Sequence, residues 1–319
     1  MSRYLMLLSP TVNRVYAGST PQLAAAELRA TCPSATDVEA TEIAGVGYLS
    51  FAADEDVLAT VSRQSSALAL FEEEGELLRP VALPDVFTLD DDIVTIPKYP
   101  GKTNEQFTQL LVNVTLAAID READGRRQIL DPMAGRGTTL STVLRLGHDA
   151  HGVELDVKAF EAMAAFYKTY FRRKRQKHAA EVTPVKRGGK SLGKRFDLTV
   201  NGQNASVFTG DARDSASLYG KKRFDAIITD APYGVAHGAT TTGKDRSPAA
   251  LLEQAIPVWA GQLKHGGALG LSWNTFGMSR DDLAGVCMRA GLEPWDSSEG
   301  FDHRVDSSIK RDLLVAIRP

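Results

Sequence analysis

The sequence is poor in the residues and runs that mark disulfide-stapled, metal-bound or membrane-embedded proteins. Its two cysteines, Cys32 and Cys287, form no Cys-x-x-Cys pair and have no histidine at metal-ligand spacing nearby, so neither a disulfide framework nor a metal site is expected. No apolar run approaches the roughly 20 residues that span a bilayer, and residues 4–8 are too short for a signal-peptide core. We therefore expect a cytoplasmic protein with no metal and no membrane partner.

Basic residues are also scarce in the N-terminal part of the chain. The net charge of -3 by itself argues weakly against a polyanionic partner, but residues 1–97 hold only 5 Lys and Arg against 15 Asp and Glu, which leaves 32 and 25 for the remainder. The C-terminal part is therefore basic. Hydrophobic residues make up 43% of the 319 residues, enough for a sizeable core and for a catalytic domain with a smaller partner.

The first 95 residues predict a small α+β domain that ends in an acidic linker. Strand and helix patterns alternate along them, with strands expected at 4–8, 47–51 and 68–71 and helices at 21–30 and 54–63. Four prolines and the triplet Asp90-Asp91-Asp92 then interrupt the periodicity between residues 79 and 100. We place the domain boundary near residue 95.

Residues 96–319 predict a doubly wound, mostly parallel sheet of the Rossmann-like α/β class. An amphipathic helix begins after Thr103, and strands alternate with helices from there on; seven strands are expected, at 128–130, 150–153, 206–208, 225–229, 268–272, 292–295 and 313–317. The last two strands are too close in sequence for a helical crossover and should pair antiparallel. A basic insertion, 168–205, interrupts this order, with eleven Lys and Arg against one acid between residues 168 and 195.

A glycine-containing turn follows the first of these strands. The segment Asp131-Pro132-Met133-Ala134-Gly135-Arg136-Gly137-Thr138-Thr139 opens a helix, whose N-terminal N–H groups and two glycines allow close approach of a ligand. Such a turn suits a nicotinamide dinucleotide or S-adenosylmethionine (SAM). The dinucleotide fingerprint wants a third glycine where Leu140 stands, so we favour SAM, whose α-ammonium group Asp131 would hold.

Acidic residues end the next two strands. Glu154 follows strand 150–153, where a carboxylate can accept both ribose hydroxyl groups. Asp211, followed by Ala212, ends the third strand, where it would meet the adenine amine. The order of these acids along the chain supports a nucleoside-containing cofactor.

The segment most indicative of chemistry is Asp230-Ala231-Pro232-Tyr233-Gly234, at the end of an apolar strand. An exocyclic amine on a base is a poor nucleophile because its lone pair is delocalised into the ring. The Asp230 carboxylate and the Ala231 carbonyl, extended before proline, would accept its two N–H bonds and aim the lone pair at a methyl group. Tyr233 would stack on the base. Catalysis would then rest on alignment and fixed dipoles.

These motifs, with the segment Pro100-Gly101-Lys102-Thr103-Asn104-Glu105-Gln106-Phe107 and the ending His303 to Asp312, resemble the tRNA guanine-N2 methyltransferases over roughly residues 98–319. The resemblance implies that Asp131, Gly135, Gly137, Glu154 and Asp211 line a SAM pocket, that Thr103 approaches the methionine carboxylate, and that Asp230 to Tyr233 hold the base amine. The family usually has two prolines before the tyrosine, and here the first is Ala231.

A second departure concerns the N-terminal half. The family carries a ferredoxin-like element followed by an RNA-binding THUMP domain, and residues 1–95 have room only for the first. Nucleic-acid contact then falls to the basic insertion; its candidate phosphate contacts are Arg172, Arg173, Lys174 and Arg175. RNA is favoured over DNA as the partner.

Two alternatives stay open from the sequence. A DNA amino-methyltransferase, acting on adenine N6 or cytosine N4, would use the same amine chemistry, and a non-catalytic SAM-binding interaction protein would fit Ala231 and the missing RNA domain. Ser272 lies in Gly270-Leu271-Ser272-Trp273-Asn274, which lacks the second glycine of a hydrolase elbow, so we expect it to be an ordinary strand-end residue. The oligomeric state is not determined by these patterns.

Overall fold

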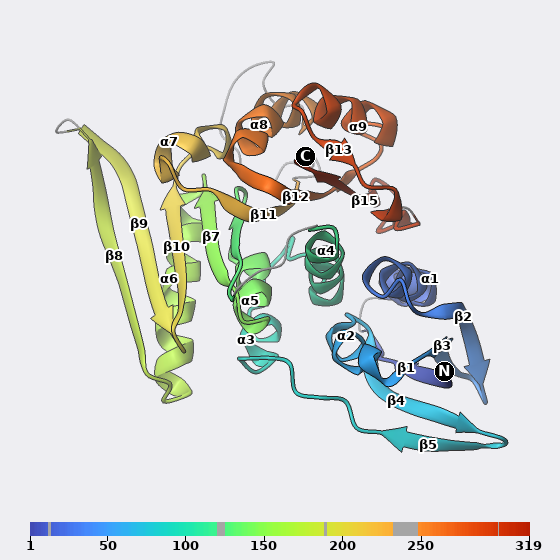
Figure 1. Ribbon diagram of the computed structural model, residues 1–319. Helices are drawn as coiled ribbons and strands as arrows, with labels where there is room; N and C mark the ends of the chain where they lie inside the picture. Colours follow the sequence, from blue (N-terminus) through green and yellow to red (C-terminus); the bar gives the residue numbers. More distant parts are fainter. Residues whose placement is uncertain (12–13, 120–124, 188–189, 232–247, 299) are drawn as a thin grey trace.

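The computed structural model describes residues 1–11, 14–119, 125–187, 190–231, 248–298 and 300–319. Two β-sheets and their helices make up these residues, with the smaller sheet N-terminal and the larger one C-terminal (Figure 1). No helix in the described stretches is long and apolar enough to cross a membrane.

The larger sheet has the doubly wound α/β order that the sequence predicts, but it is a mixed sheet and not a mostly parallel one, because a hairpin and the C-terminal strands add antiparallel pairings at its two edges. Its path is β13-β15-β12-β11-β6-β7-β10-β9-β8, with β14 paired to β15. All seven expected strands occur: β6 (Gln128–Asp131), β7 (Asp149–Glu154), β10 (Gln203–Thr209), β11 (Phe224–Asp230), β12 (Leu263–Asn274), β13 (Glu293–Pro294) and β15 (Lys310–Ile317). The first five run parallel, whereas β15 is antiparallel to both β12 and β13. The antiparallel pairing expected for the last two strands is confirmed.

Helices cover both faces of this sheet. One face carries α4 (Glu105–Ala117), α5 (Thr138–Arg145) and α6 (Val157–Arg173), and the other carries α7 (Ser215–Tyr219), α8 (Pro248–Gln262) and α9 (Arg280–Arg289) (Figure 1). Short 3-10 turns and a two-residue strand complete the described connections: η2 (Ala212–Asp214), η4 (Asp296–Ser298) and β14 (His303–Arg304). Because the strand order reverses at β6, the crevice between β6 and β11 opens at their carboxyl ends.

The smaller sheet is antiparallel, with the order β2-β3-β1-β4-β5. Its elements are β1 (Ser2–Leu8), α1 (Arg14–Thr31), β2 (Thr36–Ile43), β3 (Val46–Ala53), η1 (Glu55–Val57), α2 (Leu58–Arg63), β4 (Ala67–Glu74) and β5 (Leu77–Val81). The first six strands and helices follow a β-α-β-β-α-β succession, so the ferredoxin-like fold expected for this part is confirmed.

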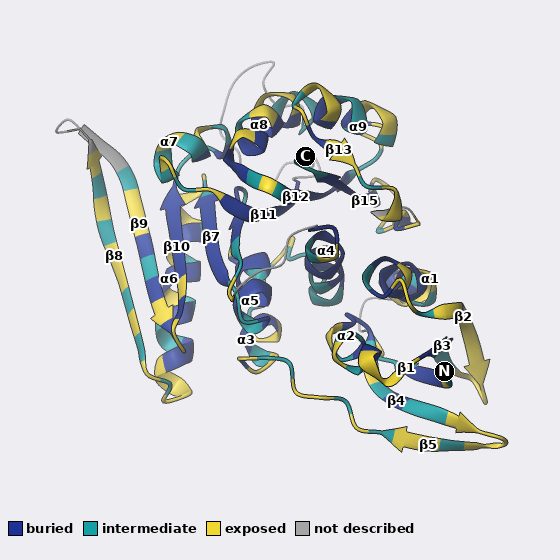
Figure 2. Cartoon of the chain, viewed as in Figure 1, coloured by how far each residue is buried: buried dark blue, intermediate teal, exposed yellow. Residues whose placement is uncertain are grey.

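Three details of this part differ from the sequence prediction. Strands β2 and β5 are not anticipated by periodicity, because both are edge strands with largely exposed, polar or proline-containing sequences (Figure 2). Helix α1 begins at Arg14 and not at Pro21. The hydroxyl of Thr20 donates to the Tyr16 carbonyl at 2.9 Å in the turn that precedes the proline.

Helix α1 joins the small sheet to the large one. One side of α1 packs on the small sheet, and the other side, with Leu23 and Ala26, belongs to the same hydrophobic core as Leu110 and Leu111 of α4. At this junction Asn113 of α4 donates to the buried carboxylate of Glu27 at 2.7 Å, and burial raises the pKa of Glu27 to about 7.

The basic insertion forms a β-hairpin that extends the sheet beyond β10. Its strands are β8 (His178–Arg187) and β9 (Lys190–Val200), and β9 pairs antiparallel with β10. The linker before α4 includes the short helix α3 (Asp92–Thr95), whose Asp92 accepts from Lys174 at the end of α6 at 2.5 Å. The acidic linker is thus tied to the basic insertion.

Candidate active site

A cavity of about 760 Å³ opens at the carboxyl ends of β6 and β11. This is the reversal point of the sheet, where ligands of doubly wound folds bind. Eight of the fourteen catalytic and cofactor-binding residues predicted from the sequence line it: Thr103, Asp131, Met133, Ala134, Gly135, Thr138, Asp230 and Ala231. These predicted residues come from three separate segments of the chain, which meet here.

Asp131 ends β6 and is buried at the base of the cavity, with 2% of its surface exposed. One of its carboxylate oxygens accepts from Thr229 Oγ1 at 2.8 Å and from the Met133 backbone N–H at 3.0 Å. Burial outweighs these donors and raises the pKa of Asp131 to about 7. A cation beside it would favour the ionised form.

The turn after Asp131 holds its two glycines in left-handed conformations. Gly135 has φ of +54° and Gly137 has φ of +87° at the start of α5. A Cβ at Gly135 would meet no atom within 4 Å, so the backbone there faces open space. A Cβ at Gly137 would press on Met163 and the Tyr167 hydroxyl at 3.1 Å. The first glycine serves the cavity and the second serves helix packing.

Glu154 ends β7 and orders the same turn. Its carboxylate accepts from the Gly135 N–H at 2.6 Å and from the Asp156 N–H at 2.7 Å. Burial raises the pKa of Glu154 above its usual range. The cavity edge beyond it is formed by Asp156 and Ala159 at the start of α6.

Asp230 ends β11 on the other side of the crevice. Thr103 Oγ1 donates to its Oδ2 at 2.5 Å, and Ser272 Oγ, from the adjacent β12, donates to its Oδ1. Arg311 Nη2 of β15 lies 3.8 Å from Oδ2. The carboxylate is held from three directions, yet each oxygen keeps lone-pair capacity for another donor.

The Arg311 guanidinium is itself fixed by aromatic packing. It lies 4.6 Å above the ring of Phe107 in α4, and 5% of its side chain is exposed. The Phe107 ring also contacts His303 at 5.1 Å and Tyr16 of α1 at 6.5 Å. A residue of the N-terminal part therefore supports the surroundings of Asp230.

Several other predictions have a different outcome. Asp211 caps η2, where Arg213 binds its carboxylate at 2.7 Å and lowers its pKa, and neither Asp211 nor Ala212 lines the cavity. Thr103 contacts Asp230, whereas the family resemblance implies a contact with the cofactor carboxylate. Pro232 and Tyr233 lie outside the described residues.

The four basic candidates of the insertion lie far from the cavity. Arg172 and Arg173 end α6, and Lys174 and Arg175 follow directly. Helix α6 has 17 residues, so its two ends are about 25 Å apart at 1.5 Å per residue. The Lys174 amine is also engaged by Asp90 and Asp92, at 2.8 and 2.5 Å.

Sequence reasoning missed several residues that line the cavity or contact Asp230. Tyr99 and Arg136 both line the cavity. The Tyr99 hydroxyl shares a hydrogen bond of 3.0 Å with Thr138 Oγ1, and the Arg136 guanidinium lies 4.8 Å from the centre of the Tyr99 ring. Ser272, expected to be an ordinary strand-end residue, is also a donor to Asp230. Arg311 falls within the ending that resembles the methyltransferase family, and this was the one signal available for it.

No protein-family model and no curated protein sequence matches the chain. Solved structures with a similar arrangement include a methyltransferase from Pyrococcus furiosus, at 12% identity over 70% of this chain and 87% of that one, with a TM-score of 0.42. A TehB-like SAM-dependent methyltransferase from Corynebacterium glutamicum shares 16% identity over 62% and 83%, with a TM-score of 0.37.

A 16S rRNA N2 methyltransferase from T. Thermophilus, in complex with AdoMet and guanosine, shares 16% identity over 92% of this chain and 60% of that one, with a TM-score of 0.39. At such identities a likeness concerns the fold alone. The assignment of the fold rests on the strand order of the chain itself.

Proposed function

We propose that the chain is a SAM-dependent methyltransferase acting on the exocyclic amine of a nucleic-acid base, with guanine N2 in RNA, and tRNA in particular, as the favoured target. The observation that carries the proposal is the meeting of Asp131 and Asp230 in one cavity, at the ends of adjacent strands. Asp131 is buried and suited to an ammonium group, whereas Asp230 is held in place by donors and suited to accept a hydrogen bond.

The residues present fit SAM. Asp131 would hold the α-ammonium group, the open backbone at Gly135 admits close approach, and Met133, Ala134 and Thr138 line the same cavity. Glu154 would accept the ribose hydroxyl groups, since it stands beside Gly135 at the end of β7. Asp211 and Ala212 would contact the adenine of SAM only if the ion pair between Arg213 and Asp211 opened. The cofactor supplies an electrophilic methyl group.

The chain's own contribution to the reaction is alignment. The Asp230 carboxylate would accept one N–H of the target amine, and the Ala231 carbonyl would accept the other, so that the lone pair is directed at the methyl group. The hydroxyl groups of Thr103 and Ser272 and the charge of Arg311 fix the carboxylate before substrate arrives. Fixed dipoles that need no reorganisation are an effective source of catalysis. Stacking on the base falls to Tyr233.

Methyl transfer from labelled SAM to separate pools of tRNA, ribosomal RNA and DNA, followed by nucleoside analysis, tests the proposal. Asp230→Ala should abolish transfer and leave SAM affinity within about threefold, since the acceptor acts on the base. Asp281→Asn, an exposed acid of α9, is the matched control and should stay active.

The outcomes separate the alternatives. Transfer to DNA alone would support the DNA amino-methyltransferase, and SAM binding with transfer to no polymer would support a non-catalytic interaction protein. Loss of SAM binding in Asp230→Ala in proportion to loss of activity would reassign Asp230 to the cofactor.

A further inference from the structure

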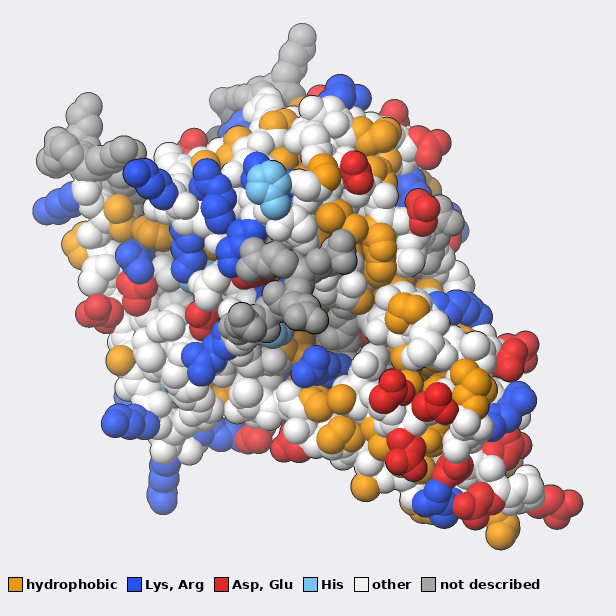
Figure 3. Space-filling model, in the orientation of Figure 1, with side chains coloured by type: hydrophobic (Ala, Val, Ile, Leu, Met, Phe, Trp, Pro, Cys, Tyr) orange, Lys and Arg blue, Asp and Glu red, His pale blue; other side chains and the backbone are white. Residues whose placement is uncertain are grey.

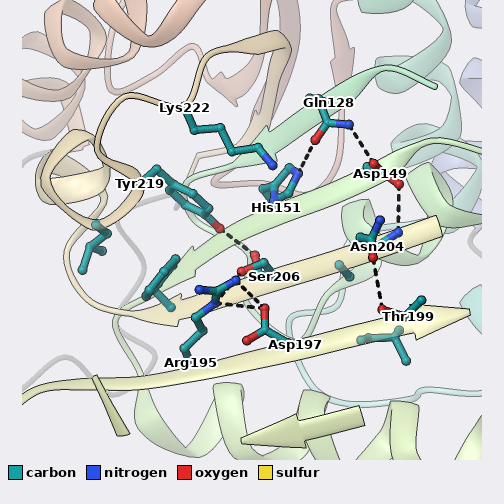
Figure 4. Close-up of a pocket in the computed structure, with 14 residues that line it drawn as sticks. Gln128, Asp149, His151, Arg195, Asp197, Thr199, Asn204, Ser206, Tyr219 and Lys222 are labelled. Carbon is teal, nitrogen blue, oxygen red and sulfur yellow. Dashed lines mark hydrogen bonds and ion pairs between the residues drawn. The ribbon is translucent and has the colours of Figure 1, made fainter. Parts of the chain in front are cut away.

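A second cavity, of about 540 Å³, lies on the sheet face opposite α6. Its floor is formed by side chains of β7, β9 and β10, and its wall by the end of α7 and the segment that follows it (Figure 4). The face is open because α7 has only five residues and cannot cover these strands. None of the residues that line this cavity lines the candidate active site.

The polar groups of the floor largely satisfy one another. Gln128 donates to Asp149 at 2.7 Å and bonds His151 Nε2 at 2.9 Å (Figure 4). Asp197 is paired with Arg195 at 2.7 Å. The acids of the cavity are therefore already matched by donors.

Two nitrogen atoms of the cavity, the Lys222 amine and His151 Nδ1, have no hydrogen-bond partner among the residues that the structure describes. The amine of Lys222 has no hydrogen bond or ion pair among the residues that the structure describes, although the side chain is half-buried and points toward His151 (Figure 4). Burial is the main cause that lowers the pKa of Lys222. His151 is 3% exposed, and its Nδ1 has no partner within the described part of the chain. Burial lowers the pKa of His151 to about 3, so the ring adds no charge.

The surroundings favour a negatively charged ligand. Lys222 is the centre of the basic run Lys221-Lys222-Arg223, and Arg195 approaches from β9. Lys and Arg side chains gather on the molecular surface over β9, β10 and the start of β11 (Figure 3). The Asp149 carboxylate attracts Lys222 without forming an ion pair with it, and the charges of Arg195 and Lys264 oppose that attraction. A half-buried amine with no hydrogen bond or ion pair is costly, and an anionic oxygen at contact distance would remove that cost.

We infer that this cavity binds a phosphate group of the nucleic-acid backbone through Lys222, with Arg195 beside it. The inference rests on the proposed function for the identity of the polymer, and it adds a contact on a face separate from the site of methyl transfer. Bound polymer would run across the open face of β7, β10 and β9.

The test compares two single variants of equal charge change. Lys222→Gln removes the cavity amine, and Lys221→Gln removes the exposed neighbouring charge. Anisotropy titrations of a labelled tRNA transcript at several NaCl concentrations should show affinity falling roughly tenfold in Lys222→Gln. The log-log salt slope should fall by about 0.7, as for one lost contact to a single strand. SAM affinity and the rate at saturating RNA should not change.

Equal losses in the two variants would overturn the site, because a general field of charge would then explain the binding. No loss in either variant would also overturn it, because this face would then not contact the RNA. Inorganic phosphate or GMP that binds at Lys222 while tRNA affinity is unchanged in Lys222→Gln would also overturn it, in favour of a free anion. If wild-type protein methylates no polymer but tRNA binding still depends on Lys222, the proposed function fails and the site stands.

Discussion

Asp230 owes its orientation to residues that lie far from it in sequence. Thr103 is 127 positions away, Ser272 is 42 positions away, and both hydroxyl groups donate to its carboxylate. Asp131, by contrast, is held within its own turn and by the adjacent β11, through Met133 and Thr229. The two acids of the site thus differ in surroundings: burial dominates for Asp131, and fixed donors dominate for Asp230.

The raised pKa of Asp131, about 7 in the cofactor-free protein, predicts pH-dependent cofactor binding. An ammonium group prefers the ionised carboxylate, so protons must leave Asp131 when SAM binds below pH 7. As the pH is lowered from 7 to 5.5, the affinity for SAM should therefore weaken roughly tenfold per pH unit. Calorimetry of S-adenosylhomocysteine binding in two buffers of different ionisation enthalpy should detect the released proton.

The Asp131→Asn variant should bind the cofactor more weakly and lose most of the pH dependence of that binding. The dependence that remains should come from Glu154, because burial raises its pKa as well. A pH profile of the variant identical to that of wild type would show that Asp131 does not face the ammonium group.

Helix α6 connects the cofactor edge of the sheet to the base of the hairpin. Its first turn, capped by Asp156, borders the cavity, and its last turn carries Arg172 and Arg173. Lys174 just beyond is already paired with Asp90 and Asp92. The four basic residues at this end therefore differ in role. Lys174 is paired with the acidic linker, whereas Arg172, Arg173 and Arg175 are exposed and open to a polyanion.

The triple variant Arg172→Ser, Arg173→Ser, Arg175→Ser should lower the salt slope of RNA binding by about 2, at 0.7 per contact. Lys174→Ser should instead leave the slope unchanged and lower the thermal midpoint, because it releases the acidic linker. Salt titrations of both variants against wild type distinguish these roles. An unaltered slope in the triple variant would remove the end of α6 from the nucleic-acid surface.

Helix α1 joins the two sheets of the molecule, because its residues contribute to the hydrophobic core of each. We propose residues 1–95 and 96–319 as the two units of the molecule, but α1 contributes Leu23 and Ala26 to the core of the larger one. Tyr16 of α1 also contacts His303, at 5.9 Å, near Arg311. The N-terminal part is therefore expected to unfold together with the catalytic part.

This cooperativity has a direct test, because all three tryptophans, 259, 273 and 295, lie in the C-terminal unit. Leu70→Ala in β4 creates a cavity in the core of the small sheet, where Leu70 is 1% exposed, at a cost of roughly 2 to 5 kcal/mol. If the two units unfold together, the denaturation midpoint followed by tryptophan fluorescence should fall in this variant. Leu77→Ala, at a side chain 71% exposed, is the control. An unchanged midpoint in Leu70→Ala would mean independent units.

The sequence by itself determined seven strands of the large sheet and the acids that end three of them, but not the strands β8, β9 and β14. The hydrophobic pattern that predicts a strand or a helix is set by neighbouring residues in the sequence. Strands β6, β7, β10 and β11 are largely buried, so their apolar residues make this pattern clear (Figure 2). Chain order then placed Asp131, Glu154 and Asp230 at one edge, because parallel strands end together. Exposed edge strands such as β2 carry no such pattern and were missed.

Only the tertiary structure decided which side chains meet. The pairing of Arg213 with Asp211, of Lys174 with the linker, and of Arg311 with Asp230 depends on rotamers and on how layers pack. So does the unmatched amine of Lys222, which exists because a short α7 leaves a sheet face open. Contacts of this kind join residues from separate elements, and no repeat along the chain encodes them.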